Sequence, residues 1–361
     1  MASPITGELT EKVKIWGRDL GFQQVGITDT DLSTHEARLD DWLAKGFQAD
    51  MHYMSMHGIK RSQPAVLVPG TIRIISARMD YLPDNDNLRE TLADHDQACI
   101  ARFALGRDYH KVIRARLRKL QSTINAYLLE HNLPGFAARV FTDSAPVLEK
   151  GIAEKSGLGW IGKNTLLLNE NAGSWFFLGE IYTNIPFQME SSPATNRCGS
   201  CQACIDICPT KAIVAPWRLD AKRCISYHTI ENKGTIPVSV REKMGNRIFG
   251  CDDCQMVCPW NRYATPTAEP DFKPRHNLNT ASLLSLFQWS EQEFDEKSAG
   301  SAIRRAGYEG WLRNISIALG NANYKPNIVA ALKQRLEAAS PMLKEHLQWA
   351  IERQLTKSTQ S

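Results

Sequence analysis

Eight of the nine cysteines fall between residues 198 and 258, which limits what this chain can fold into more than any other feature. The first four form the run Cys198-Gly-Ser-Cys201-Gln-Ala-Cys204-Ile-Asp-Ile-Cys208-Pro209. In bacterial ferredoxins with this Cys-x2-Cys-x2-Cys-x3-Cys-Pro spacing, three thiolates bind one iron–sulfur cluster and the fourth binds the other. The run therefore predicts a ferredoxin-like segment with two clusters.

A second, incomplete copy of the motif follows at Cys251-Asp-Asp-Cys254-Gln-Met-Val-Cys258-Pro259, and Cys224 is the obvious replacement for its missing first cysteine. Paired Cys-x2-Cys units also build structural zinc sites, but zinc requires neither the third cysteine at this spacing nor two Cys-Pro endings. We therefore favour two 4Fe-4S clusters over zinc. The predicted ligand sets are Cys198, Cys201, Cys204 with Cys258, and Cys224, Cys251, Cys254 with Cys208.

The start of the chain carries no recognisable export signal. Residues 1–10 have neither a basic region nor an apolar core, and no twin-arginine pair precedes a hydrophobic stretch. No apolar run approaches the roughly 18 residues of a membrane span. We therefore expect a cytoplasmic protein without a membrane partner, in which clustered cysteines serve as metal ligands rather than disulfides. Cys99, which stands apart, is expected to be a buried packing residue.

The chain has 361 residues, enough for two or three folded units. We predict the α+β class: a mixed-sheet domain over residues 1–187, the ferredoxin-like domain over 188–265, and a helical, HEAT-like domain over 275–361. In the last domain, Ser340 is a predicted N-cap before Pro341, and Asn327 precedes the apolar positions of another helix.

Hydrophobic periodicity gives the expected elements of the first domain. Leu9, Val13, Trp16 and Leu20 recur at helical spacing, and Gly21 follows them as a C-terminal cap. A long amphipathic helix is predicted from Ile113 to Tyr127, and a hairpin is predicted around residues 169–173, with strands at 165–168 and 175–182. Because a hairpin pairs antiparallel strands, a purely parallel sheet is disfavoured. Further strands are expected at residues 25–27, 71–77, 99–105 and 137–142.

Several motifs outside the cysteine segment make the chain resemble the epoxyqueuosine reductase family over almost its whole length. They are Ala101-Arg-Phe-Ala-Leu-Gly-Arg107-Asp108-Tyr109-His110, Phe141-Thr-Asp143-Ser-Ala-Pro-Val-Leu-Glu149-Lys150, Gly159-Trp-Ile-Gly162-Lys163-Asn164-Thr165, and Gly300-Ser-Ala-Ile-Arg304-Arg305. The resemblance implies a cobalamin-dependent enzyme with two 4Fe-4S clusters that reduces epoxyqueuosine to queuosine at the wobble position of tRNA. In this scheme the clusters supply electrons to cob(I)alamin, and the first domain binds the cofactor.

The chain lacks the Asp-x-His-x-x-Gly signature that supplies a histidine ligand to cobalt. The resemblance therefore implies base-off cobalamin. A cytosolic corrinoid dehalogenase and an electron-transfer module without chemistry of its own are the alternative functions.

Asp143 is the candidate proton donor. It ends a predicted strand among apolar neighbours, whose desolvating effect would raise the pKa of a carboxyl. From the residues alone, the favoured interpretation of Asp143 is an N-cap for a helix that begins at Ala145 or Pro146. The resemblance implies the catalytic role.

Other candidate residues are assigned by their position near these motifs. Glycines at 159 and 162 permit close backbone approach to a corrin ring, although an ordinary turn is the alternative. The expected cofactor-binding residues are Arg61, Lys163, Asn164, Thr165, Ser226, Tyr227 and Asp252. Tyr109 and His110 are expected to face the substrate, although a core histidine is the commoner interpretation.

Two groups of basic residues fit a polyanionic partner, although such runs are more often solvated faces. The net charge of +4 permits RNA binding without requiring it. The groups are Lys111, Arg114, Arg116, Arg118 and Lys119, and Arg304, Arg305, Arg313 and Lys325. We expect a monomer that binds tRNA carrying epoxyqueuosine in its anticodon loop and receives electrons from an external donor that the sequence does not identify.

Overall fold

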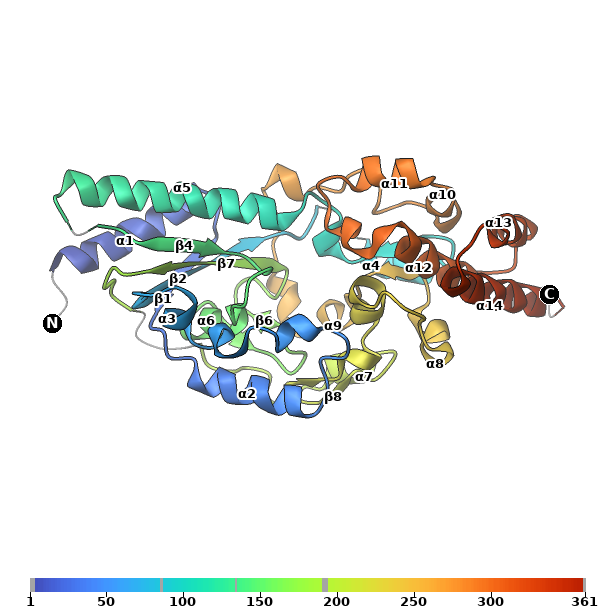
Figure 1. The fold of residues 1–361 in the computed structure, drawn as a ribbon, viewed down its shortest axis with the longest axis horizontal. Coiled ribbons are helices and arrows are strands. Elements are labelled where there is room, and N and C mark those ends of the chain that lie inside the picture. Colours follow the sequence, from blue (N-terminus) through green and yellow to red (C-terminus); the bar gives the residue numbers. More distant parts are fainter. Residues whose placement is uncertain (1–3, 85–86, 134, 190–193, 360–361) are drawn as a thin grey trace.

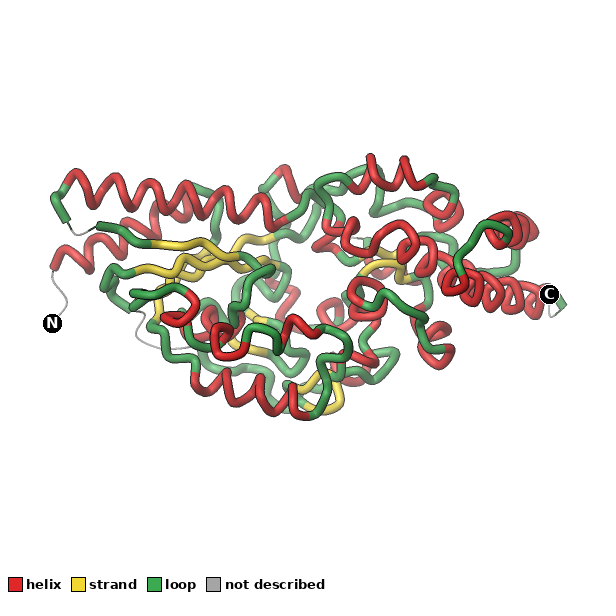
Figure 2. The backbone as a smooth tube through the Cα atoms, in the orientation of Figure 1, coloured by secondary structure: helices red, strands yellow, loops and turns green. Residues whose placement is uncertain are grey.

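The computed structural model describes residues 4–84, 87–133, 135–189 and 194–359. The molecule is elongated, with a sheet and its covering helices at one end and the last helices of the chain at the other (Figure 1). The strands gather mainly in the sheet end, and the cysteine-rich segment lies between the two ends (Figure 2). None of the described helices is long and apolar enough to cross a lipid bilayer.

The main sheet has four strands in the order β1-β2-β7-β4, and all neighbours are antiparallel. A separate parallel pair joins β3 to β10, so the α+β class is confirmed. The strands of the main sheet are β1 (Gln24–Thr28), β2 (Arg73–Asp80), β4 (Ala138–Phe141) and β7 (Phe176–Thr183).

The two faces of the sheet are covered by different helices. Helices α1 (Pro4–Asp19) and α5 (Tyr109–Glu130) pack on one face through a shared apolar core, and α6 (Glu149–Lys155) lies on the other face. Side chains alternate along a strand, so in β7 Ile181 points toward α5, whereas Tyr182 packs with Ile152 of α6. This alternation directs Glu180 toward α6 as well.

The cysteine-rich segment is made of short elements joined by loops. Helices α7 and α9, which each carry a cysteine of the two motifs, lie against each other. Parallel pairing of β10 with β3 (Cys99–Ile100) ties the segment to the first domain, and Cys99 is buried as expected. The elements are α7 (Ala203–Ile207), β8 (Ile213–Ala215), β9 (Arg218–Leu219), the π-helical turn η5 (Tyr227–Glu231), α8 (Val238–Arg241), β10 (Arg247–Phe249) and α9 (Asp253–Met256).

The last part of the chain is helical, as predicted. Ser340 caps its final helix by accepting a hydrogen bond of 3.2 Å from the backbone N–H of Leu343. The preceding helix begins at Pro326 rather than after Asn327, because proline suits the first helical position. The helices are α10 (Leu283–Phe287), α11 (Glu291–Ser298), α12 (Gly307–Asn321), α13 (Pro326–Leu336) and α14 (Pro341–Ser358).

Two predicted strand arrangements are wrong. The chain does reverse at residues 169–173, where Asn169 and Gly173 form an antiparallel bridge. Residues 165–168 do not pair with β7, because β6 (Leu167–Leu168) pairs with β5 (Trp160–Ile161), while β2 and β4 occupy both edges of β7. The predicted strand at 99–105 ends after Ile100, where the partner strand ends and a 3₁₀ turn begins. The remaining helices are α2 (Ser33–Ala44), α3 (Pro64–Leu67) and α4 (Leu88–Ala93).

Helix α14 provides a matched test of its buried face. Leu347 is 0% exposed and Leu355 is 45% exposed in the same helix. We expect Leu347→Ala to lower the free energy of unfolding by about 2–5 kcal/mol, because it leaves a cavity in the core. Leu355→Ala should cost about 1 kcal/mol or less. Urea unfolding of both variants measures the difference, and equal losses would contradict this packing.

Candidate active site

The thiols of the cysteine-rich segment gather in two neighbourhoods. Cys258 lies near Cys198 and Cys201, whereas Cys254 lies near Cys224, Cys204 and Cys208. Burial, and then the neighbouring thiol of Cys258, raises the pKa of Cys204 to about 11. Cys204 therefore borders both neighbourhoods, and the division of the thiols into the two predicted ligand sets remains a prediction.

All nine cysteines carry free thiols. In the described ranges, no three His, Cys, Asp or Glu side chains converge closely enough to hold a single metal ion. The eight thiols of this segment are of the type and number that two 4Fe-4S clusters require, because each iron atom takes one thiolate.

The turn at residues 163–165 holds the cysteine loops in place. The buried Lys163 donates hydrogen bonds to the backbone oxygens of Gly199 (2.7 Å) and Cys201 (2.9 Å). Asn164 donates to the backbone oxygen of Cys254 at 3.4 Å. Thr165 has a left-handed backbone (φ +67°), and its carbonyl accepts a hydrogen bond from Lys150. These three predicted cofactor contacts thus lie where the first domain meets both cysteine loops.

Ser226, Tyr227 and Asp252 also lie beside the cysteines. The backbone N–H groups of Ser226 and Tyr227 bond the sulfur of Cys224, while burial raises the pKa of this thiol. The Tyr227 hydroxyl donates to Asp50 at 2.6 Å.

The remaining two candidates make backbone contacts. Asp252 is buried and accepts a hydrogen bond from the backbone N–H of Arg102 at 2.8 Å. Arg61 is buried and donates to the backbone oxygens of Tyr53 (2.7 Å) and Met54 (3.2 Å). Their proposed contacts with the cofactor remain predictions.

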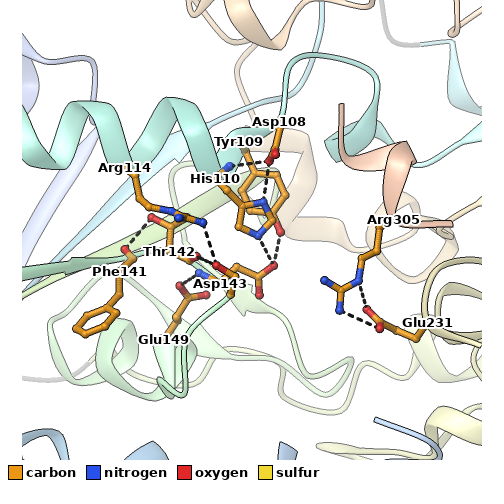
Figure 3. Close-up of polar contacts among 11 residues, drawn as sticks. Asp108, Tyr109, His110, Arg114, Phe141, Thr142, Asp143, Glu149, Glu231 and Arg305 are labelled. Atoms are coloured by element: carbon orange, nitrogen blue, oxygen red, sulfur yellow. Dashed lines mark hydrogen bonds and ion pairs between the residues drawn. The ribbon is translucent and has the colours of Figure 1, made fainter. Parts of the chain in front are cut away.

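Asp143, Tyr109 and His110 meet at one end of the sheet (Figure 3). The Tyr109 hydroxyl donates to Asp143 Oδ2, which lies 3.2 Å from His110 Nε2. The other ring nitrogen, Nδ1, lies 2.7 Å from Asp108, which is the N-cap of α5. The first turn of α5 and the loop after β4 therefore bring these residues together.

The N-cap interpretation of Asp143 is wrong. Helix α6 begins at Glu149, and Asp143 sits in a loop with a left-handed backbone (φ +52°). The loop makes tight three-residue turns in place of a helical turn, such as the hydrogen bond from Ser144 N to Thr142 O (2.6 Å).

The charges of this group differ from the expectation that apolar neighbours keep Asp143 protonated. Although 56% of the Asp143 side chain is exposed, the protein around it desolvates the carboxyl, and this effect alone would raise its pKa. Hydrogen bonds from His110 and Tyr109 outweigh that effect and lower the pKa of Asp143. Burial likewise disfavours charge on His110, but Asp108 and Asp143 raise the pKa of His110 to about 9. At neutral pH the exchangeable proton therefore resides on the imidazolium.

Aromatic stacking fixes the position of these side chains. The Tyr109 ring stacks on Phe177 of β7 with centroids 4.1 Å apart and an interplanar angle of 5°. The His110 ring stacks on the other side of Tyr109 at 4.1 Å. The stack runs outward from the sheet core, so these rings cannot turn away without losing packing.

A second polar group faces Asp143 from the C-terminal half of the chain (Figure 3). Arg305 pairs with Glu231 through contacts of 2.8 and 2.9 Å, and its guanidinium lies over the ring of Tyr53 at 5.9 Å. Its positive charge also helps to lower the pKa of Asp143, after the effects of burial, His110 and Tyr109.

One member of the basic group near the C-terminus is not available to bind RNA. Arg313 is 1% exposed and donates to the backbone oxygens of His228, Asn232 and Gly234, so its predicted place in the patch is wrong. Arg304 pairs with Asp295. Lys325 pairs with Asp96.

Sequence reasoning missed several carboxylates of the site. They are Asp108, Glu149, Glu180 and Glu231. Glu180 left a signal, because it is the single charged residue in the otherwise apolar stretch 176–183. Asp108 directly precedes Tyr109 and His110 in the sequence, whereas Glu149 and Glu231 are brought to the site by chain reversals that a local pattern does not contain.

Comparison with known proteins identifies the family of the chain. Residues 61–144 match the family described as epoxyqueuosine reductase QueG, DUF1730, and residues 197–261 match a 4Fe-4S double cluster binding domain. The epoxyqueuosine reductase of Pseudomonas aeruginosa is 54% identical over 353 residues, which cover 98% of this chain and 96% of that protein. The chain belongs to the epoxyqueuosine reductase family. It is therefore an oxidoreductase with a 4Fe-4S double cluster domain.

Two solved epoxyqueuosine reductases have the same fold. One, in complex with an epoxyqueuosine-modified tRNA-Tyr stem loop, has a TM-score of 0.82 and 26% identity, covering 96% of this chain and 99% of that one. The Bacillus subtilis enzyme, solved with its aspartate-bearing catalytic loop swung out of the active site, has a TM-score of 0.81, 26% identity and the same coverage.

The contacts of His110 with Asp108 and Asp143 predict a raised pKa for its imidazole, which can be measured. We expect the His110 ring to titrate near pH 9 in NMR spectra of the folded protein, and Asp108→Asn to lower this pKa. Because the folded pKa is above the unfolded value, the stabilisation is fully present below pH about 6.5 and is lost as the pH rises through about 9. An unchanged His110 titration in Asp108→Asn would contradict the assigned contact.

Proposed function

We propose that the protein reduces epoxyqueuosine to queuosine at the wobble position of tRNA in the cytoplasm, with base-off cobalamin as the reactive cofactor and Asp143 as the proton donor. Two 4Fe-4S clusters, fed by an external donor, would supply the electrons. The observation that carries the proposal is the Asp143–His110–Asp108 array, which holds a mobile proton in a protein of this family.

The reaction sets what the residues must provide. Removal of the epoxide oxygen leaves an alkene and water, and it consumes two electrons and two protons. Cobalamin, when bound, would supply a strongly nucleophilic cobalt centre for opening the epoxide. The protein must position the substrate and donate protons to the departing oxygen.

The residues around Asp143 fit a large, mostly apolar cofactor. Met56 and Ile59 are exposed apolar side chains in the segment that Arg61 holds through its hydrogen bond to the backbone oxygen of Tyr53. Tyr53 of this segment is close enough to Asp143 for their charges to interact. Exposed apolar side chains beside a polar array suit a corrin ring. The nearby Thr165 and Asn164 could bind the amide arms of the ring.

Proton donation is assigned to Asp143 and its partners. A proton that moves from His110 Nε2 to Asp143 Oδ2 leaves a neutral acid facing the substrate. Asp108 keeps the other ring nitrogen protonated, which fixes the orientation of the imidazole. Tyr109 orients the same carboxylate through its hydroxyl.

Binding of tRNA is supported by the relative solved with a modified stem loop. Lys111, Arg118 and Lys119 are exposed on α5, the helix whose first turn carries Tyr109 and His110. Their charges are available to phosphates near the proposed substrate site.

The chemical step is tested by replacing Asp143. Asp143→Asn keeps a residue type that tolerates the left-handed backbone but removes the acid. We expect kcat to fall by about 100-fold or more, with cluster and corrinoid spectra unchanged. The assay is anaerobic turnover of tRNA bearing epoxyqueuosine, followed by nucleoside analysis. Full activity would refute the role of Asp143, and normal queuosine in cells lacking the protein would refute the function.

The ligand sets are tested by iron content. The double variant Cys201→Ala/Cys258→Ala removes two ligands of one predicted set and should lower bound iron from about eight to about four atoms per chain. Cys99→Ala is the matched control and should leave iron unchanged, since Cys99 is a packing residue. Full iron content in the double variant would contradict the assignment.

A further inference from the structure

Two carboxyl groups lie behind the Asp143 loop and have no part in the chemistry proposed above. Glu149 opens α6, and Glu180 lies in the centre of the sheet on β7. In the sheet register Glu180 is opposite Ser76 on one side and Phe141 on the other. Glu180 is 0% exposed, so it reaches neither solvent nor substrate.

Glu180 is poorly supplied with hydrogen-bond donors. Among the described residues, no hydrogen bond of ordinary geometry reaches either of its carboxylate oxygens, although the hydroxyl of Ser76 lies close enough to lower its pKa. An ionised carboxylate buried with so little compensation would be very costly, so burial favours the neutral acid for Glu180. The carboxyl group of Glu149 also lies within hydrogen-bonding reach. Two facing carboxyls can bond only if at least one of them carries a proton.

The electrostatics of the pair agree with a retained proton. Burial, and then the charge of Glu149, raises the pKa of Glu180. Burial, and then the charge of Asp143, raises the pKa of Glu149. Two interacting carboxyls in a desolvated site hold at least one proton at neutral pH.

Glu149 connects this pair to the catalytic loop. Its Oε1 accepts the hydrogen bond of the Asp143 backbone N–H. Asp143 has a left-handed backbone, and tight turns such as Ala145 N to Asp143 O (2.8 Å) follow it. Non-glycine residues keep such conformations only where their surroundings hold them. On the opposite side, Arg114 of α5 donates to Ser144 Oγ at 2.9 Å. The loop is therefore held both from the sheet side and from α5 (Figure 3).

We propose that Glu149 and Glu180 share a proton and together position the catalytic loop: neutral Glu180 donates a hydrogen bond to Glu149, and Glu149 accepts the Asp143 N–H. The inference rests on the proposed function of Asp143. Both glutamates are positioning residues, because neither reaches the reacting atoms. A relative has been solved with its catalytic loop swung out, and in this chain that movement would break the Glu149–Asp143 hydrogen bond.

The first test separates position from chemistry. Glu149→Ala removes the acceptor and should lower kcat by about 100-fold, with KM for tRNA unchanged, because the loop loses its catalytic orientation. Glu149→Gln keeps an acceptor oxygen, so its kcat should be at least about tenfold higher than that of Glu149→Ala. Glu130→Ala, at the far end of α5, is the matched control and should have normal kcat. Iron content and thermal unfolding identify variants that fail to fold. If Glu149→Ala fails to fold, Glu149→Gln still tests the proposal.

The second test detects the proton directly. Infrared difference spectra of the protein against Glu180→Gln at pH 7 should contain the carbonyl band of a protonated carboxylic acid. The amide of Glu180→Gln can still donate to Glu149, so this variant should keep most of the turnover that Glu180→Leu loses. Absence of the acid band, or equal kcat in Glu180→Leu and the unaltered protein, overturns the proposal.

The outcomes for Glu149 also separate this proposal from the function on which it rests. Normal kcat in Glu149→Ala with an inactive Asp143→Asn would overturn the positioning role alone. Full activity of Asp143→Asn would remove the proposed function together with the positioning role.

Discussion

The antiparallel placement of β7 between β2 and β4 is the constraint on which the active site depends. Because side chains alternate along this strand, Phe177 supports the Tyr109 ring on one face, and Glu180 lies under the Asp143 loop on the other. A slip of one residue would exchange the two faces, place Glu180 in the apolar core beneath α5, and remove the ring that supports Tyr109. The register of one strand thus sets both sides of the site.

The charged groups around Asp143 divide into two layers. Near the substrate side, Asp108, His110 and Asp143 form an ionised array whose positive member is an imidazolium. Behind it, Glu149 and Glu180 lie in a desolvated environment that favours neutral acids. In the proposed mechanism, the first layer would release a proton to the substrate, and the second would keep its proton and hold the loop in position. The difference follows from the presence or absence of a cationic partner rather than from residue type.

How much could be predicted from the sequence depends on the range of the interaction. The cysteine motif is local, and the family and its double cluster domain follow from it and from neighbouring motifs. Long helices such as α5 follow from periodicity. The strand pairing of residues 165–168 could not be assigned correctly, because the partner of Leu167 is Ile161, across a tight turn that resembles a loop. Arg313 was predicted to be a surface charge, because a sequence pattern does not show the backbone carbonyl groups with which it forms hydrogen bonds.

The apolar core of the C-terminal helices has a consequence for the chain as a whole. Ile100 and Leu105 from the first domain pack in the same core as Trp311 and Leu347. A protein shortened after residue 265 would leave these first-domain side chains uncovered and exposed to intermolecular association. The C-terminal helices are therefore not an optional appendage, because they complete an apolar core to which the first domain contributes. Gene truncation at this boundary would yield an aggregating fragment rather than a smaller enzyme.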